Sequence, residues 1–198
     1  RIPIGIDTRL FTPQTPSKKL EARSKLGIPE GAIVAGSFVK DGVGQGEGDE
    51  PKLIKGPDIF LEVIGRLKNE VPNLYVLLSG PSRGYIKRGL EKLGVPYKHE
   101  YLKDFRKLPG LYDAIDLYII TSREEGGPKS CLESMAKGIP LVTTLVGQCK
   151  DLVTNGQNAL MAAQEDVEVL TKHSLDVIRD EKLREKLTTN GFTTAEEN

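Results

Sequence analysis

Cysteine and histidine are scarce in this chain of 198 residues, which has two of each. Cys131 and Cys149 form no CxxC motif, and neither lies in a cluster with His99 or His173. A structural zinc site needs clustered ligands of this kind, so the sequence argues against one. We expect both thiols to be reduced and partly buried, as in a cytosolic protein.

A net charge, a long apolar run and a leader segment are also lacking. The 28 Lys and Arg residues balance the 28 Asp and Glu residues, which argues against bulk electrostatic binding to nucleic acid. No apolar stretch approaches the ~18 residues that a membrane-spanning helix needs, and no signal peptide is recognisable. We therefore expect a cytoplasmic protein. Because the chain opens on Arg1, inside a motif-like segment, we interpret it as a piece of a longer protein.

Glycine-rich nucleotide fingerprints are absent too. The loop after the first apolar stretch has glycines at positions 42, 44, 46 and 48. This spacing does not match G-x-G-x-x-G, in which the helix starts within the motif, and no Walker P-loop sequence occurs. The sequence therefore disfavours a nicotinamide-dependent oxidoreductase and a P-loop NTPase. A flexible, acidic surface loop is one interpretation of this segment.

The sequence does contain a regular alternation of short apolar stretches and amphipathic ones. We predict strands over residues 32–39, 74–80, 97–102, 117–120, 141–144 and 159–161, and helices over 17–26, 57–70, 85–93, 108–113, 130–137, 166–178 and 181–189. Nearly continuous apolar strands that alternate with helices are typical of a parallel sheet covered on both faces. The predicted fold class is therefore α/β: a doubly wound, mostly parallel, six-stranded sheet. We assign it to residues 17–190, with a connector at 1–16 and a tail at 191–198.

In open sheets of this kind, ligands bind beyond the carboxyl ends of the strands. Lys55 directly precedes Gly56 and Pro57, and proline is favourable at the first position of a helix. An ammonium group beside the free N–H groups of a helix start makes an anion site, so Lys55 is a candidate phosphate ligand. Arg83, in the loop after the second predicted strand, is either a phosphate ligand or a solvated charge.

The loop after the fourth predicted strand carries the strongest signal. Gly126 and Gly127 allow the backbone to approach a ligand closely, and Pro128 suits the first turn of the following helix. The free N–H groups of Lys129, Ser130 and Cys131 would then face an anion, with the Lys129 ammonium nearby.

Two carboxylates flank this glycine turn: Glu125 and, eight residues later, Glu133. A charged acceptor strengthens each hydrogen bond from a sugar hydroxyl, so acids in such a loop suit a sugar ligand. For Glu133 an alternative stays open, because Ser130-x-x-Glu133 also matches a capping box, in which the carboxylate binds a backbone N–H. Tyr101 and Leu102, at the end of the third predicted strand, either flank a flat ring or belong to the core.

These residues resemble the signature of the family 4 (group 1) retaining glycosyltransferases, specifically the carboxy-terminal, donor-binding half of their two-domain GT-B fold. The stretch EGGPKSCLESMAKGIP, from Glu125 to Pro140, is similar to the family's paired-glutamate motif. Three more segments resemble family sequences: IPIGIDTRLFTP (2–13), KGPDIFLEVIGRLK (55–68) and VGQCKDLVTNGQNALM (146–161). The resemblance covers nearly the whole chain.

The resemblance implies a role for each matching residue. Glu125 would accept hydrogen bonds from the donor sugar and, with Lys55, is predicted to be catalytic. Glu133 would hold the ribose hydroxyls, the backbone from Gly126 to Lys129 would bind the diphosphate, and the loop at Tyr101–Leu102 would lie near the base. The main catalytic task is then to stabilise the departing nucleoside diphosphate, which lysines and a helix N-terminus can do without a metal. No DxD motif is present to indicate a metal, and no cofactor is expected.

Two positions depart from the family pattern. The family usually has an arginine after the glycine that ends the first strand, whereas Gly36 is followed here by Ser37. Lys40 or Lys52, in an unusually long loop, is the candidate replacement. The aromatic residue that often follows the first glycine of the motif is Gly127 in this chain.

The implied function is binding of a nucleoside diphosphate sugar and transfer of a hexosyl group to a sugar or lipid acceptor. The acceptor would bind an amino-terminal half that we expect to lie outside this chain and that could also attach the enzyme peripherally to a membrane. The isolated chain should then bind nucleotide weakly and transfer nothing. A sugar-nucleotide 2-epimerase and a non-catalytic nucleotide-binding module remain alternatives, and the sequence does not specify the base, the sugar or the acceptor.

Overall fold

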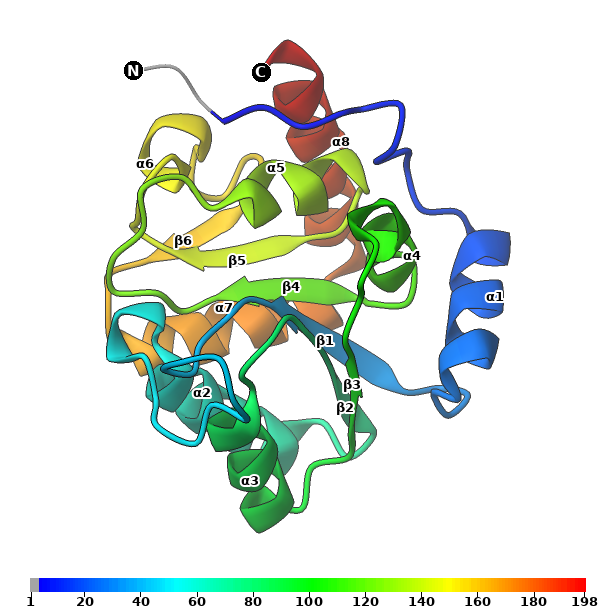
Figure 1. The fold of residues 1–198 in the computed structure, drawn as a ribbon. Helices are drawn as coiled ribbons and strands as arrows, with labels where there is room; N and C mark the ends of the chain where they lie inside the picture. Colours follow the sequence, from blue (N-terminus) through cyan, green and yellow to red (C-terminus); the bar gives the residue numbers. More distant parts are fainter. Residues whose placement is uncertain (1–3) are drawn as a thin grey trace.

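The computed structural model describes residues 4–198, which form an α/β fold with helices on both faces of one sheet (Figure 1). The strands are β1 (Ile33–Phe38), β2 (Leu74–Ser79), β3 (Tyr97–Glu100), β4 (Leu117–Ile120), β5 (Leu141–Thr144) and β6 (Leu160–Ala162). Each pairs in parallel with its neighbours in the order β3-β2-β1-β4-β5-β6. The predicted fold class is confirmed, and the six-stranded sheet is parallel throughout rather than mostly parallel.

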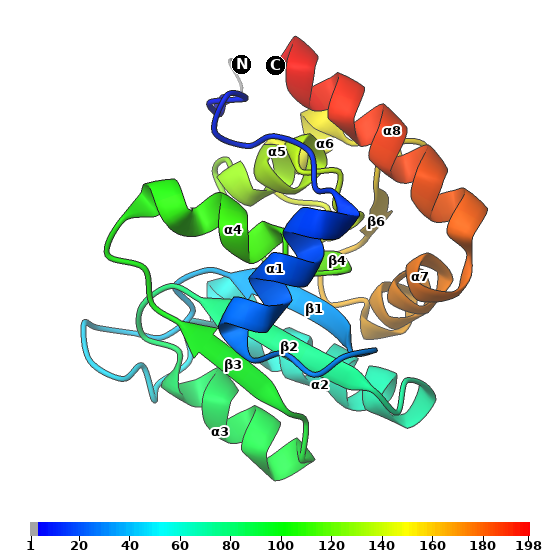
Figure 2. The same cartoon turned by 90° about the vertical axis from the view of Figure 1, so that its right-hand side faces the viewer.

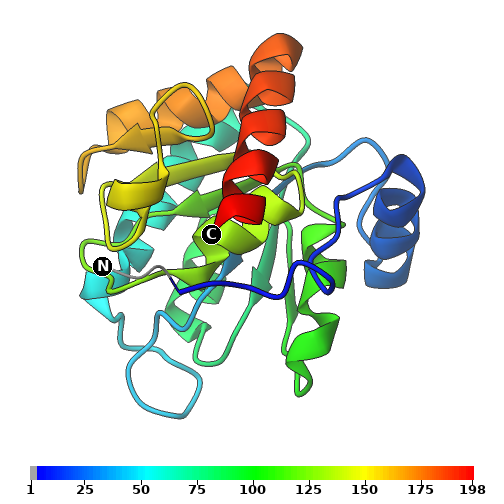
Figure 3. The same cartoon turned by 90° about the horizontal axis from the view of Figure 1, so that it is seen from above.

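The helices form the two outer layers. They are α1 (Pro16–Leu26), α2 (Pro57–Glu70), α3 (Gly84–Leu93), α4 (Leu108–Tyr112), α5 (Lys129–Ala136), α6 (Cys149–Leu152), α7 (Val167–Arg179) and α8 (Glu181–Glu197), with 3-10 turns η1 (Leu53–Lys55) and η2 (Phe105–Lys107). Side chains of α2, α3 and α7 pack on one face of the sheet, and those of α4, α5 and α6 pack on the other. Figure 2 shows α1 beside α4, and Figure 3 shows α8, which contacts both α5 and α7 and so joins the two layers.

Strands β1, β2, β4 and β5 are buried on both faces, which explains their nearly continuous apolar sequences, whereas the edge strand β3 is half-buried and mostly polar. Along β2, Leu77 belongs to the core under α4 and α5, whereas Val76 and Leu78 belong to the core under α2, α3 and α7. Successive side chains of a strand point to opposite faces, so a strand covered on both sides needs apolar residues at every position.

The end of the chain differs from the prediction. The sequence predicts a helix that ends at residue 189 and a tail over 191–198, yet α8 continues to Glu197. Gly191 is buried there, and Thr194 Oγ1 accepts a hydrogen bond from Asn158 Nδ2 at 2.9 Å. Glycine, threonine and asparagine are weak helix formers. Packing of α8 against α5, rather than local propensity, therefore extends this helix.

The start of α1 also differs from the prediction. The helix begins at Pro16, and the side chain of Thr15 accepts a hydrogen bond from the backbone N–H of Lys18 at 3.2 Å. Thr15 thus caps the helix, which we predicted to start at residue 17. Gly27 follows the predicted last residue and ends the helix in the left-handed conformation that glycine adopts without a steric cost.

The segment predicted to be a connector packs against the domain. Gln14 Nε2 donates hydrogen bonds to the carbonyl oxygens of Asp113 at 2.8 Å and Ile115 at 3.1 Å. A Cβ on Gly5 would lie 3.3 Å from the carbonyl oxygen of Asn198, so this segment also runs past the end of α8. Residues 1–3, where the predicted connector begins, lie outside the described residues.

The glycine-rich loop over 40–52 has a defined fold of its own. Its two arms pair in antiparallel fashion at Gly42, and the carbonyl oxygen of Glu47 accepts the N–H of Gly84 at 2.5 Å. That bond satisfies a free donor at the start of α3. A Cβ on Gly42 would lie 2.3 Å from the carbonyl oxygen of Ser82, so glycine is needed for this contact.

Candidate functional site

The candidate site lies at the carboxyl edge of the sheet, between β1 and β4. The strand order reverses there, because the chain passes from β1 through α2 to β2 on one side and from β4 through α5 to β5 on the other. Such a switch point leaves a crevice beyond the strand ends, which is where open α/β sheets bind ligands. The polar residues that line it include Ser37, Asp41, Lys55, Thr121, Ser122, Glu125 and Ser130.

Lys55 and Glu125, the two residues predicted to be catalytic, meet in this crevice. Lys55 Nζ lies 2.5 Å from Glu125 Oε2, and the two side chains keep only 19% and 12% of their exposure. Ser122 Oγ donates a hydrogen bond to Glu125 Oε1 at 2.9 Å. A ligand in the crevice therefore meets a fixed ammonium–carboxylate pair that is shielded from water, where charges interact more strongly than at the surface.

The turn that positions Lys55 requires a glycine. Gly56 has a φ of 63°, and a Cβ on it would lie 1.9 Å from the carbonyl oxygen of Thr121. The Thr121 hydroxyl donates to the carbonyl oxygen of Gly56 at 2.8 Å. This close approach holds the end of η1 against the end of β4 and brings Lys55 to the loop that carries Glu125.

Glu133 lies in α5 and is almost fully buried, with 4% of its surface exposed. The hydroxyl of Tyr112 donates to Glu133 Oε2 at 2.9 Å. Burial raises the pKa of Glu133 to about 7, although the Tyr112 hydrogen bond and the Lys129 ammonium lower it. The capping-box alternative is wrong, because α5 begins at Lys129 and has no side-chain cap. Pro128, predicted in the first turn, is the residue just before the helix.

Sequence reasoning did not identify Tyr112 as part of this site. The tyrosine precedes Glu133 by 21 residues and ends a short helix of mostly apolar residues. An aromatic side chain in such a helix is typical of the hydrophobic core. The available signal is that a buried tyrosine usually needs a hydrogen-bond partner for its hydroxyl.

The glycine turn between Glu125 and α5 has one open side and one packed side. Gly126 is exposed, and a Cβ on it would meet nothing within 4 Å, whereas a Cβ on Gly127 would lie 2.9 Å from Ile4 Cδ1. Gln148 holds the turn in place with two hydrogen bonds. Its Nε2 donates to the carbonyl oxygen of Pro128 at 3.0 Å, and its Oε1 accepts the N–H of Ile4 at 2.9 Å. The turn is thus held by α6 and by the segment before α1.

The first residues of α5 divide between the surface and the crevice. The side chain of Lys129 is exposed, while Ser130 lines the crevice and its hydroxyl forms a hydrogen bond with Tyr118. The prediction is wrong for Cys131, because its N–H donates to the carbonyl oxygen of Pro128 at 3.1 Å. The donors at this helix start that remain for an anion are therefore those of Lys129 and Ser130.

Tyr101 and Leu102 line a separate cavity of about 310 Å³ beyond the ends of β1, β2 and β3. Tyr101 is 58% exposed, so the structure excludes it from the core. Leu102 is half-buried and packs against the core. Phe38 and Phe105 line the same cavity, which therefore presents several apolar and aromatic walls to a flat group.

Lys40 and Lys52, the candidates to replace the missing arginine, are both exposed, and neither lines the crevice. Arg83 instead reaches Ser37, the position where the arginine is missing: Nη2 donates to Ser37 Oγ at 3.1 Å and Nη1 to the Ser37 carbonyl oxygen at 2.8 Å. Its side chain is fully buried, with Asp41 Oδ1 3.0 Å from Nε. Both alternatives for Arg83 are wrong: it is neither solvated nor available to a ligand, because it binds the strand ends.

The Asp41–Arg83 pair is an ion pair without a well-aligned hydrogen bond. Asp41 Oδ1 and Arg83 Nε lie 3.0 Å apart, yet neither atom has a hydrogen-bond partner of acceptable geometry. Burial raises the pKa of Asp41 to about 6, against the lowering effect of the Arg83 charge. Asp41 lines the crevice, and its carboxylate is paired with the fully buried Arg83.

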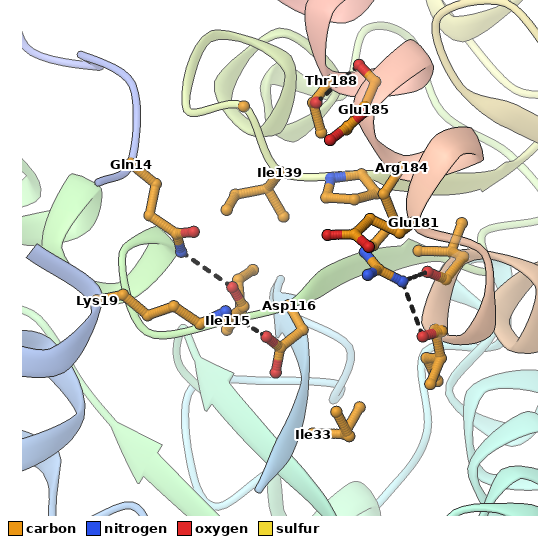
Figure 4. A pocket seen from close by; sticks show the side chains of 14 residues that line it. Gln14, Lys19, Ile33, Ile115, Asp116, Ile139, Glu181, Arg184, Glu185 and Thr188 are labelled. Carbon is orange, nitrogen blue, oxygen red and sulfur yellow. Dashed lines mark hydrogen bonds and ion pairs between the residues drawn. The ribbon is translucent and has the colours of Figure 1, made fainter. Parts of the chain in front are cut away.

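A larger cavity of about 340 Å³ lies at the opposite edge of the sheet, between the segment before α1 and helix α8 (Figure 4). Lys19 and Asp116 on one side are paired at 2.5 Å, and Arg184 on the other donates to the carbonyl oxygens of Val177 and Ile178. Because it faces the amino ends of the strands, and because Lys19 and Asp116 are already paired with each other, we do not assign the ligand site to it.

Cys131 and Cys149 are both buried and free of disulfides. Across residues 4–198, no group of three or more His, Cys, Asp or Glu side chains is arranged to hold a metal ion. None of the helices in that range is both long enough and apolar enough to span a bilayer.

A family model matches most of the chain. Residues 51–194 match the model described as glycosyl transferases group 1. The chain belongs to this family. The matched range contains Lys55, Glu125 and Glu133.

Curated relatives of this group 1 chain are longer proteins. It is 27% identical over 203 residues to the lipopolysaccharide core biosynthesis mannosyltransferase LpsB of Rhizobium meliloti, covering 98% of this chain and 54% of the relative. It is 29% identical over 173 residues to a D-inositol 3-phosphate glycosyltransferase of Corynebacterium urealyticum, covering 82% of this chain and 38% of the relative. The chain therefore spans about half or less of the length of these relatives.

Solved structures of glycosyltransferases share the fold. The Anabaena protein Alr3699/HepE, in complex with UDP-glucose, superposes with a TM-score of 0.81 at 22% identity, over 98% of this chain and 51% of that one. The C-terminal domain of the group 1 protein LpcC from Francisella tularensis superposes with a TM-score of 0.78 at 18% identity, and the match covers 98% of each chain. The group 1 chain therefore has the Rossmann-like architecture of these domains.

Proposed function

We propose that this chain binds a nucleoside diphosphate sugar and is the donor-binding half of a retaining, metal-independent glycosyltransferase of family 4 that transfers a hexosyl group. The observation that carries the proposal is the Lys55–Glu125 pair at the switch point, 2.5 Å apart and mostly shielded from water. Glu133, buried on the far side of the glycine turn, supplies the second carboxylate.

In this proposal Lys55 neutralises the diphosphate. An ammonium group has three donors, and one of them is used by Glu125. The other two can reach phosphate oxygens, together with the free N–H groups at the start of α5. Developing charge on the leaving diphosphate is stabilised most where water is excluded, which favours the shielded crevice over an exposed lysine such as Lys40.

The two carboxylates would hold the two sugars. Glu125 accepts hydrogen bonds from the transferred sugar, and Ser122 and Lys55 fix the orientation of its carboxylate. Glu133 accepts hydrogen bonds from the ribose, and the base lies against Tyr101 and Leu102 in the neighbouring cavity. The glycine turn between the acids then lies along the diphosphate. The complexes of Alr3699/HepE with UDP and with UDP-glucose support this choice of ligand class.

The acceptor would be a sugar or a lipid, bound by an amino-terminal domain that the longer relatives have room for. No cofactor is needed in this proposal. The protein would act in the cytoplasm, with any membrane attachment provided by the acceptor half. The isolated chain is expected to transfer no sugar, and measurable transfer by it would contradict this part of the proposal.

A thermal-shift panel of UDP, GDP, ADP and NAD tests the donor site. A diphosphate at ~100 times its dissociation constant adds roughly 2.7 kcal/mol of stability, a shift of several degrees in Tm. We expect one nucleoside diphosphate to stabilise the chain, NAD not to do so, and Lys55→Ala to remove most of the shift. Lys40→Ala is the matched control, since it removes an exposed lysine near the same loop. No shift with any diphosphate, or equal shifts in both variants, would contradict the proposal.

A further inference from the structure

Tyr112 is held at Glu133 by a rigid aromatic cluster. Its side chain is fully buried, and its ring packs edge-on against Phe38 at a centroid distance of 4.9 Å and lies tilted against Tyr118 at 5.4 Å. Phe11 contacts it from a further side at 6.1 Å. A ring fixed on these sides has little rotational freedom, so its hydroxyl is aimed at the carboxylate before any ligand arrives.

The backbone that carries Tyr112 is tied to the helix that carries Glu133. Lys137, at the end of α5, pairs with Asp113 at 2.6 Å, and its side chain is 2% exposed. Gln14 spans both helix ends: its Nε2 donates to the carbonyl oxygen of Asp113, and its N–H donates to the carbonyl oxygen of Lys137. The separation of α4 and α5, and with it the hydroxyl–carboxylate contact, is therefore set by interactions outside the crevice.

The contact divides the two oxygens of Glu133 between protein and ligand. Oε2 accepts the Tyr112 hydroxyl, while in the described part of the chain Oε1 has no hydrogen-bond partner. The groups that face the carboxylate are the hydroxyls of Tyr112 and Tyr118 and the ammonium of Lys129. The Tyr118 hydroxyl accepts the backbone N–H of Phe38 at 2.9 Å and also forms a hydrogen bond with Ser130. Within residues 4–198, the hydroxyl that hydrogen-bonds to Glu133 is therefore that of Tyr112.

We infer that Tyr112 is a positioning residue for nucleotide binding, whose hydroxyl orients the Glu133 carboxylate so that Oε1 faces the ribose hydroxyls. The inference rests on the proposed function, and Tyr112 itself does not touch the nucleotide. Hydrogen bonds to charged groups are stronger than neutral ones, so a hydroxyl bound to the carboxylate also favours its ionised form. Loss of the hydroxyl should both loosen the carboxylate and make it harder to ionise.

Tyr112→Phe keeps the ring and removes only this hydroxyl. We expect the affinity for the nucleoside diphosphate to fall roughly tenfold at pH 7, in line with the loss of one hydrogen bond to a charged group. The loss should shrink toward pH 9, where Glu133 ionises without help. A merely structural role for the hydroxyl would weaken binding equally at every pH.

Titration calorimetry with UDP, GDP and ADP in turn, from pH 6 to pH 9, provides the test for wild type, Tyr112→Phe, Glu133→Gln and the double variant. The two effects should not add, because Tyr112 acts through Glu133. Tyr97→Phe is the matched control: it removes a hydroxyl that donates to Glu91 at 2.7 Å, on the edge strand. We expect it to bind like wild type.

Each outcome separates the two proposals. If wild type binds no diphosphate, the proposed function fails and the inference fails with it. If wild type binds but Tyr112→Phe matches it at every pH, or loses as much affinity in the Glu133→Gln background, the inference alone is overturned. A carboxyl ¹³C titration of Glu133 without nucleotide gives a check that does not depend on binding. The midpoint should rise above about 7 in Tyr112→Phe, and an unchanged midpoint would also overturn the inference.

Discussion

Glu133→Gln should gain stability relative to the wild type as pH rises from 4.5 to 8, while it weakens nucleotide binding. Burial raises the pKa of Glu133 from its ordinary value of 4.5 to about 7 in the folded chain. Between these two pH values the unfolded chain releases the proton and the folded chain keeps it. The free energy of unfolding of the wild type therefore falls as pH rises through this window, and it levels off above pH 7.

The size of the effect follows from the shift in pKa. Each unit corresponds to ~1.4 kcal/mol, so the wild type should lose about 3 kcal/mol between pH 4.5 and pH 8 through this one group. Glutamine does not titrate, so the variant avoids the loss. The absolute stability of the variant also includes any cost of burying the new amide, but that cost does not depend on pH. The quantity to compare is thus the difference in unfolding free energy between variant and wild type as a function of pH.

Urea denaturation at half-unit steps from pH 4.5 to pH 8 measures this difference. It should grow by about 3 kcal/mol in favour of Glu133→Gln, equivalent to a Tm difference of roughly 10 °C in a chain of this size. Glu30→Gln, which removes a carboxylate from an exposed turn, is the matched control and should show no such trend. A flat difference for Glu133→Gln, or one that grows toward low pH, would refute the reasoning that burial dominates the ionisation of Glu133.

Three further predictions concern the stability of the site and its binding of diphosphate. Gly56→Ala should lower the free energy of unfolding, measured by urea denaturation, by several kcal/mol, because the left-handed backbone and the Thr121 carbonyl leave no room for a Cβ. Gly126→Ala should lower it by under about 1 kcal/mol, and equal losses would contradict the close-contact argument. Arg83→Met should lower the free energy of unfolding by roughly 3–5 kcal/mol, because it leaves the buried carboxylate of Asp41 unpaired. The loss should be smaller at pH 5 than at pH 8, since this carboxylate is protonated at low pH. Lys55→Ala should weaken diphosphate binding at least tenfold while Lys40→Ala changes it less than about twofold, a contrast that equilibrium titration would reveal or refute.

Much of the framework is local and could be read from the sequence. The strands Leu117–Ile120 and Leu141–Thr144 match their predicted bounds, because short apolar runs between turn residues carry their own signal. The start of α2 at Pro57 was also predictable, because proline is favoured at the first position of a helix. Packing set the bounds that prediction missed, notably the last turns of α8.

The pairing of Lys55 with Glu125 could be predicted from the sequence only in part. The sequence indicated that both lie in loops beyond strand ends, and the parallel sheet brings such loops to one edge. That these two loops meet depends on β1 and β4 being neighbours, which follows from the strand order and from the contact between Gly56 and Thr121. The roles of both residues toward a ligand stay predictions.

By itself the sequence determined the fold class, the elements of the sheet and the glycine turn between two acids, because apolar periodicity and glycine or proline positions act over a few residues. Only the tertiary structure decided the partners of the buried polar groups. Tyr112 reaches Glu133 across 21 residues, and Arg83 reaches Ser37 across 46. A buried polar group takes whichever partner the packing brings within hydrogen-bond distance. That choice depends on which strands and helices become neighbours, which no local pattern records.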